Sequence, residues 1–159
     1  VTGVQTCALP ISKKSQNIHS IQDMTDKILG AQAGSSGYLN FEGQPELLKN
    51  RVKDQKANQY QSFNEALIDL KNDRIDALLI DRVYANYYLQ SEGILNDYNV
   101  FSAGFESEAF AVGVRPADKT LLDALNQAFI SLYQEGKFQE ISQKWFGEDV
   151  ATSQVKNQE

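Results

Sequence analysis

The stretch from Tyr60 to Arg82 reads YQSFNEALIDLKNDRIDALLIDR and decides the fold. Ser62 and Glu65 make an S-x-x-E capping box, and the apolar residues after them recur at helical spacing, so a helix is expected to begin here. The run from Ile75 to Ile80 is short and mostly apolar, which is typical of a central strand with both faces covered. Asp81 then lies at the carboxyl end of this strand.

The same alternation of strands and helices extends in both directions. Upstream, the pattern predicts strands at 27–33 and 58–61, with a helix from Pro45 to about Lys53 between them. Downstream, it predicts helices at 83–89, 118–135 and 138–145, a strand at 99–102, a second buried strand at 110–114, and a tail that frays after Gly147. This order is typical of an α/β protein with a parallel, doubly wound sheet.

The composition excludes several classes of protein. The chain has 159 residues, with 21 Asp and Glu against 15 Lys and Arg, for a net charge of −6. This acidic balance disfavours a nucleic-acid partner, and no run approaches the roughly 18 apolar residues of a membrane-spanning helix. The length suits one core of common size, or one domain and part of another.

The first eleven residues look foreign to the rest of the chain. Residues 1–11 read VTGVQTCALPI, carry no charge, contain Pro10 and precede the abruptly polar SKKSQN. The string resembles the in-frame translation of a sequencing-library adapter, so we expect it to be non-native. The alternative is the end of a signal peptide, although a basic n-region and a long apolar region are missing. Without this segment the chain has no cysteine, since Cys7 is the only one, which excludes disulfides and thiol catalysis.

Catalytic and metal-binding patterns are not found in the sequence. His19 is the only histidine and lies in a polar lead-in, so we expect a surface histidine and no Ser/His/Asp triad. No Cys/His cluster and no EF-hand spacing predicts a metal site. Tyr84, Tyr87 and Tyr88 could wall a ligand pocket, but their helical spacing favours packing.

Two loops lie where an open α/β sheet places its ligands, beyond the carboxyl ends of the strands. Gly34-Ser35-Ser36-Gly37 could direct amide and hydroxyl groups at an anion, or it could be a plain turn. Asp81 could accept hydrogen bonds from an ammonium group, or it could cap the helix that begins at Arg82. Together the two loops suit a zwitterion, the head group of an amino acid.

Four segments carry a family resemblance: AGSSGY (33–38), YQSFNEALIDLKNDRIDALLIDR (60–82), GFESEAFAVGVR (104–115) and LNQAFISLYQEGKFQEISQKWFG (125–147). They are similar to the polar amino-acid branch of the bacterial extracellular solute-binding proteins of ABC transporters, family 3. The resemblance implies a type II periplasmic-binding-protein-like α/β fold, in which two lobes joined by two crossing strands close on the ligand.

The resemblance also implies a domain map and site residues. Residues 12–108 correspond to a nearly complete second lobe, 109–115 to a hinge strand, 116–147 to the last helices of a first lobe that is otherwise missing through N-terminal truncation, and 148–159 to a polar tail. Ser35 and Ser36, with Gly34 in the same loop, match the residues that hold the ligand's α-carboxylate, Gln32 matches a side chain that reaches the ligand, and Asp81 matches the α-ammonium acceptor. The family's carboxylate-clamping arginine belongs to the missing lobe.

The implied function is capture of a polar amino acid outside the membrane and its delivery to an ABC permease, with no cofactor and no chemistry. We expect a monomer, extracellular or periplasmic, and possible lipid anchoring is left open because the signal is not present in this sequence. Two alternatives share the fold: a cyclohexadienyl dehydratase-like enzyme, which needs a general acid and base in the cleft, and a receptor sensor domain, which needs a membrane span after Gly147.

Overall fold

The chain divides into two compact units. The computed structural model describes residues 2–157. The larger unit comprises Cys7–Glu106, and the smaller unit combines the residues up to Thr6 with those from Ser107 onward. The predicted second lobe begins at Ser12, whereas the larger unit also includes Cys7–Ile11, because Ala8–Ile11 pair with a strand at its centre.

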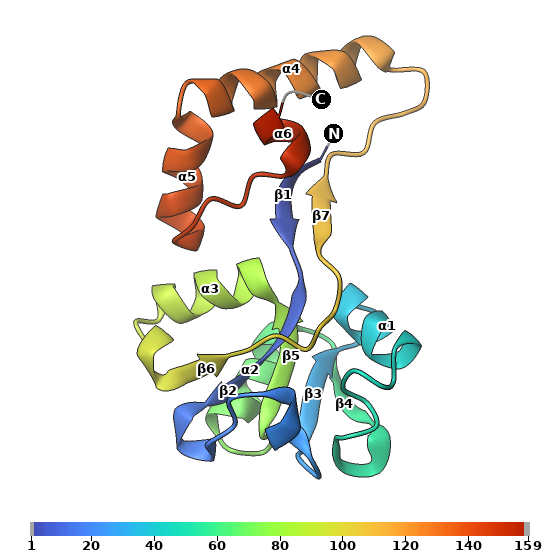
Figure 1. Ribbon diagram of the computed structural model, residues 1–159, viewed down its shortest axis with the longest axis vertical. Coiled ribbons are helices and arrows are strands. Elements are labelled where there is room, and N and C mark those ends of the chain that lie inside the picture. The colour runs from blue at the N-terminus through green and yellow to red at the C-terminus, as the bar shows by residue number, and fades with distance from the viewer. Residues whose placement is uncertain (1, 158–159) are drawn as a thin grey trace. The chain divides into compact units, whose positions relative to one another are not determined.

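The larger unit is built on a five-stranded sheet in the order β4-β3-β5-β2-β6 (Figure 1). Its strands are β2 (Ala8–Lys13), β3 (Leu29–Gln32), β4 (Ala57–Tyr60), β5 (Ala77–Asp81) and β6 (Tyr98–Val100). β3 pairs in parallel with β4 and β5, as the strand-helix order predicts. β2 runs antiparallel to both β5 and β6, so the expectation of an all-parallel sheet is wrong for this strand. The pattern missed β2 because most of it falls in the segment that was judged foreign.

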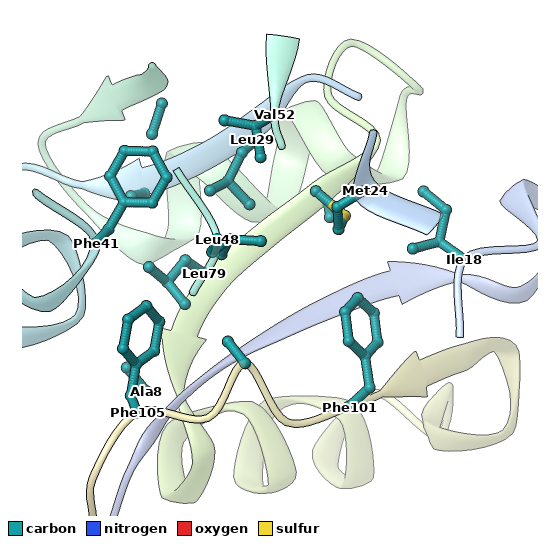
Figure 2. Packing of buried hydrophobic residues seen from close by; sticks show 14 residues of the cluster. Ala8, Ile18, Met24, Leu29, Phe41, Leu48, Val52, Leu79, Phe101 and Phe105 are labelled. Carbon is teal, nitrogen blue, oxygen red and sulfur yellow. The ribbon is translucent and has the colours of Figure 1, made fainter. Parts of the chain in front are cut away.

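Both faces of this sheet are covered. The helices are α1 (Ser36–Gly43), α2 (Phe63–Lys71) and α3 (Arg82–Ser91), with short 3₁₀ turns η1 (Lys14–Gln16), η2 (Ile21–Met24), η3 (Lys53–Gln55) and η4 (Leu95–Asp97). Along β5, Ala77 and Leu79 join the core that includes Phe41 of α1 (Figure 2), whereas Leu78 and Ile80 join the core beneath α2 and α3. This alternation confirms the doubly wound architecture.

The start of α2 follows one half of the capping-box prediction: Ser62 caps the helix, but the Glu65 side chain bonds the amide of Gln61 and not that of Ser62. The Glu65 amide donates to Ser62 Oγ at 3.3 Å, and the Gln61 amide donates to Glu65 Oε2 at 3.1 Å. Two amides at this helix start are therefore satisfied by side chains.

The prediction of a helix from Pro45 to about Lys53 is wrong. The helix of this region is α1, which begins earlier because the Ser35 side chain caps it, and Pro45 follows its end at Gly43. The chain then continues through turns in which Asp54 and Gln55 adopt positive φ angles of 55° and 52°. Leu48 and Val52 are buried in these turns, so their apolar spacing reflects the core and not a helix.

Over its described residues, the smaller unit contains a two-stranded ribbon and three helices. β1 (Thr2–Thr6) pairs antiparallel with β7 (Glu108–Ala111), and the helices are α4 (Lys119–Gln134), α5 (Lys137–Phe146) and α6 (Ser153–Asn157). The prediction of a buried strand at 110–114 is wrong in burial, because β1 is the neighbour of β7 in this ribbon and Phe110 is 54% exposed.

The core of the smaller unit is small. Phe138 of α5 packs with Ala151 and Val155, against Val4 and Phe129 among others. The segment after Gly147, expected to fray, therefore contributes buried residues. By contrast, apolar side chains of α4 and α5 are exposed: Leu121, Leu132, Ile141 and Trp145. Within residues 2–157, no helix is long and apolar enough to cross a membrane.

Candidate functional site

A small hollow lies at the carboxyl edge of the sheet in the larger unit. It has a volume of about 20 Å³, and Ser35, Ser36, Gly37, Phe63 and Asp81 line it above a floor of small and aliphatic residues from β2 and β5. Three of the five predicted site residues thus meet in one place. They come from the loop after β3 and from the end of β5, which is where the topology of an open α/β sheet places a ligand.

The loop after β3 directs the start of α1 into this hollow. Gly34 has a φ of +71°, a left-handed conformation that favours glycine. Ser35 Oγ accepts a hydrogen bond from the Tyr38 amide at 3.1 Å and donates one to the Gln32 carbonyl at 2.9 Å. The next amides, at Ser36 and Gly37, belong to a first helical turn that has no intrahelical acceptors, and the helix dipole makes this end attractive to an anion.

Gly37 allows α1 to sit close to the sheet. A Cβ atom at this position would lie 3.0 Å from Ala8 Cβ and 3.6 Å from Leu79 Cγ. The hollow is therefore shallow because helix and strands are in near contact beneath it.

Asp81 is held at the edge by the helix that follows it. Its Oδ1 accepts a hydrogen bond from the Tyr84 amide at 3.0 Å, which confirms that it caps α3. The Arg82 amide donates to the Cys7 carbonyl at 2.9 Å and fixes the same turn to the strand segment beside it. A carboxylate offers about four lone-pair sites, so a cap and an ammonium acceptor are compatible at one residue.

Gln32 and Gly34 do not line the hollow. Gln32 Nε2 donates to the Gln61 carbonyl at 3.2 Å, a bond that joins the ends of β3 and β4. Around Gly34, nothing lies within 4 Å of where a Cβ would be. Their roles toward a ligand stay predictions.

Phe63 is the aromatic residue among the lining residues that sequence reasoning missed. Its place on the apolar face of α2 indicated packing, and it does pack against the core beneath α2 and α3. Its ring also lies 5.2 Å from that of Tyr84, centroid to centroid, with 39° between the planes. The available signal was its position directly after the cap Ser62, close to the end of β4.

The tyrosines of α3 mainly pack. Tyr84 and Tyr88 contact the core, whereas Tyr87 is 43% exposed. None of the three is among the residues that line the hollow. The packing interpretation is therefore confirmed for Tyr84 and Tyr88.

An ion-pair network joins β4, α2 and the turn that follows α2. Asp69 Oδ1 accepts from Arg74 Nη1 at 2.9 Å, and Asp69 Oδ2 accepts from the Tyr60 hydroxyl at 2.9 Å. Hydrogen bonds from Arg74 and Tyr60 lower the pKa of Asp69, whereas burial and the bond to Asp69 raise the pKa of Tyr60 to about 12. This network fastens β4 to α2 and does not line the hollow.

Two further sequence predictions concern His19 and metal ligands. His19 is exposed, as expected. Over residues 2–157, no group of three or more His, Cys, Asp or Glu side chains is placed to hold a metal ion.

The sheet with helices on both faces defines a doubly wound α/β lobe, with a small hollow at the carboxyl edge of the sheet. The bacterial extracellular solute-binding proteins, family 3, match residues 10–148, and the chain belongs to this family. The expected type II periplasmic-binding-protein-like fold is confirmed.

Individual relatives agree with this assignment. The chain is 30% identical over 146 residues to ABC transporter arginine-binding protein 1 of Escherichia coli (strain K12). This alignment covers 89% of this chain and 56% of that protein. An ABC uptake transporter substrate-binding protein from Streptococcus pneumoniae, solved with bound histidine, is 66% identical with a TM-score of 0.85, covering 96% of this chain and 62% of that one. A polar amino acid ABC uptake transporter substrate-binding protein from Streptococcus thermophilus is 56% identical with a TM-score of 0.77, covering 98% and 59%.

The chain spans about half the length of the curated relatives it matches.

Proposed function

We propose that this protein is the substrate-binding component of an ABC importer, and that it captures a polar amino acid and delivers it to a membrane permease. The observation that carries the proposal is the meeting of Ser35, Ser36 and Asp81 around one hollow. The start of α1 suits the α-carboxylate, and the Asp81 carboxylate suits the α-ammonium group. An amino-acid head group carries these two charges a few bonds apart.

The relatives narrow the choice of ligand. Proteins named for binding arginine and L-cystine match this chain at 27–30% identity, and the Streptococcus pneumoniae protein at 66% identity holds histidine. L-Histidine is therefore the first ligand to test. The residues of the larger unit hold the common head group, so the side-chain preference resides mainly in groups that this chain does not contain.

The proposed setting follows from the family. Its members are extracellular solute-binding proteins, and we extend this to a monomer, free or lipid-anchored, that needs no cofactor and docks on a permease. An enzyme on the same fold needs a general acid and a general base. Among the residues that line the hollow, Asp81 is the only ionisable side chain, which supports binding without chemistry.

Calorimetric titration of the intact protein, extended to the length of its relatives, tests the proposal. The panel is the twenty amino acids, L-cystine and prephenate, the last as a probe of the dehydratase alternative. We expect one or a few polar amino acids to bind with micromolar or tighter affinity and no turnover of prephenate. Failure of every amino acid to bind, or turnover of prephenate, would contradict the proposal.

A further inference from the structure

We propose that the tail after Gly147 is a strap that positions strand β1 at the connection between the two units. The strap comprises residues 148–157. The inference rests on the proposed function and adds to it a determinant of affinity outside the ligand site. Loosening the strap weakens amino-acid binding, although none of its residues lines the hollow.

The chain crosses between the two units twice. One crossing follows Thr6, at the end of β1, and the other precedes Ser107, directly before β7. β1 and β7 pair with each other, so both crossings leave the smaller unit from one narrow ribbon. A movement of one unit relative to the other must be absorbed by these strands or by the residues next to them.

The strap pairs with the edge of β1 that faces away from β7. The Gln5 amide donates to the Val150 carbonyl at 2.7 Å, and Val4 forms an antiparallel bridge with Ala151. The helix of the strap, α6, also contacts β1 (Figure 1). The hydrogen bond and the bridge use main-chain groups, so they do not depend on which side chains stand at positions 4 and 5.

The strap is itself anchored by burial. Val150, Ala151 and Val155 are 1%, 2% and 4% exposed, respectively. Ala151 and Val155 pack with Phe138 of α5 in the core of the smaller unit. The segment that holds β1 is therefore part of the core and not a loose end.

Asp149 adds polar contacts at the start of the strap. Its Oδ1 accepts a hydrogen bond from the Ala151 amide at 2.9 Å. Its Oδ2 accepts one from the Tyr133 hydroxyl of α4 at 3.3 Å and lies 3.2 Å from Lys156 Nζ of α6. The strap is thus tied to α4, while its two ends are tied to each other.

These contacts restrict β1 before a ligand arrives. A two-stranded ribbon alone is only marginally stable in water, and the strap gives β1 a second neighbour at Val4 and Gln5. A connecting strand held in one register limits the range of open arrangements that the protein samples. Less conformational freedom is then lost on ligand binding, which favours affinity.

Two variants of the intact protein test the strap: a chain that ends at Gly147, and Val155→Ala, which removes two buried methyl groups from α6. The matched control is Val52→Ala, which removes the same groups at a 3% exposed site in the larger unit. Calorimetry with L-histidine and L-arginine measures affinity, and hydrogen exchange of the amide at position 5 measures the attachment of β1.

In Val155→Ala we expect faster exchange at position 5 and a loss of affinity of about threefold or more. This lies within the roughly 2- to 30-fold range for residues that do not touch the ligand. The chain that ends at Gly147 should show a larger loss. Val52→Ala should lower the melting temperature as Val155→Ala does, with affinity within twofold of the wild type.

Thermal melts show which variants fold, and Val155→Ala keeps the test decisive if the shortened chain does not. Unchanged exchange at position 5 in every folded variant overturns the attachment of β1. Faster exchange with affinity within twofold of the wild type shows that the strap only stabilises the smaller unit, and an equal loss of affinity in Val52→Ala overturns its role as well. If the wild type binds neither amino acid, the proposed function fails together with the strap's role in affinity.

Discussion

Asp81 combines a local and a functional requirement in one side chain. Its position at the end of a buried strand and at the start of α3 is set by the strand-helix turn, and the Tyr84 amide fixes the orientation of its carboxylate. A capping residue that also faces a hollow is pre-organised for a ligand, because its rotamer is held before binding. The cap thereby lowers the ordering cost of the proposed ammonium contact.

We expect Asp81→Asn to weaken amino-acid binding by the intact protein about tenfold to a hundredfold, since one charge-assisted hydrogen bond is worth roughly 1.5 to 3 kcal/mol. Asparagine caps helices as well as aspartate does, so the melting temperature should change little. Calorimetry and a thermal melt measure the two effects. Asp97→Asn is the matched control, because it makes the same charge change in η4, directly before β6 and at the opposite edge of the sheet. If Asp81→Asn binds the amino acid within twofold of the wild-type affinity, Asp81 is not the ammonium acceptor and acts only as the cap of α3.

At the same scale, the sequence predicted Ser35, Ser36 and Asp81 in one place because the carboxyl ends of parallel strands share an edge. It could not predict that Gln32 bonds to the Gln61 carbonyl instead of lining the hollow. It could not separate the two roles of Phe63 either, because both a core residue and a wall residue fit the same helical spacing.

Strand β3 shows how closely the elements of the larger unit approach one another. A Cβ on Gly30 would lie 2.5 Å from Ile75 Cδ1 and 3.1 Å from Tyr60 Cε2. Ile75 is only 2% exposed, so its side chain would have to shift within the core to make room for a Cβ on Gly30. Glycine therefore suits the packing of β3.

Gly30→Ala should therefore destabilise the protein by about 1–3 kcal/mol, the range for an overpacked core. The matched control is Gly43→Ala at the end of α1, where nothing lies within 4 Å of the new Cβ and where alanine is neutral or slightly stabilising. Urea denaturation of both variants measures the difference. Equal midpoints would show that the core around Ile75 relaxes without cost.

The hydrogen bond between Tyr60 of β4 and Asp69 of α2 predicts that the stability of the protein depends on pH in the alkaline range. Burial and the hydrogen bond to Asp69 raise the pKa of Tyr60 from an ordinary 10.0 to about 12. The folded state thus favours the neutral phenol, so the stability from this group is fully present below pH 10 and is lost as the pH rises through 12.

Ultraviolet absorbance of tyrosinate, compared between the wild type and Tyr60→Phe, isolates this group. At pH 11 an ordinary tyrosine is about nine-tenths ionised, whereas we expect Tyr60 to add little tyrosinate absorbance to the difference. Circular dichroism at the same pH verifies that both proteins are folded. A difference that titrates with a midpoint near pH 10 would contradict the prediction.

Among the elements, helices with strong caps or long apolar stripes were predictable. α2, α3, α4 and α5 all lie within a few residues of the predicted ranges. The early start of α1 was missed because the sequence pattern favours Pro45 as the first helical residue. In the structure the helix begins at Ser36 and is capped by Ser35. β2 was missed for a different reason, since four of its six residues, Ala8–Ile11, lie in the segment that the sequence analysis sets aside as foreign.

Part of the segment 1–11 belongs to the sheet of the larger unit. Ala8–Ile11 pair with β5, and Ile11 is fully buried. The place beside β5 in the sheet therefore suits an apolar strand, whether or not residues 1–11 are native. That the string is foreign stays a prediction, which amplification of the locus tests: native codons for VTGVQTCALPI directly before SKKSQN would refute it.

At the scale of the whole molecule, the two units are unequal. The larger unit holds two extensive apolar cores, whereas the core of the smaller unit contains few residues and several apolar side chains of α4 and α5 are exposed. We therefore attribute the greater part of the chain's stability to Cys7–Glu106. Fold class and family were predictable because they depend on the pattern of the elements. The sizes of the two cores were not, since they depend on long-range packing.

The 159-residue chain itself should bind no free amino acid with a dissociation constant below about 10 μM, because groups from two lobes hold a small zwitterion in the proposed mode. The hollow has a volume of only about 20 Å³, so we expect most of the ligand to stay in water, which competes for every charged contact. The arginine that the family resemblance places in the other lobe would add a bidentate contact to the carboxylate. Losing two or three such contacts at roughly 1.5 to 3 kcal/mol each changes a micromolar site into a millimolar or weaker one. Ligand-observed NMR on this chain, with the intact protein as the positive control, measures the effect. Micromolar binding by this chain would mean that the larger unit alone holds the ligand and that the contacts expected from the missing first lobe are dispensable.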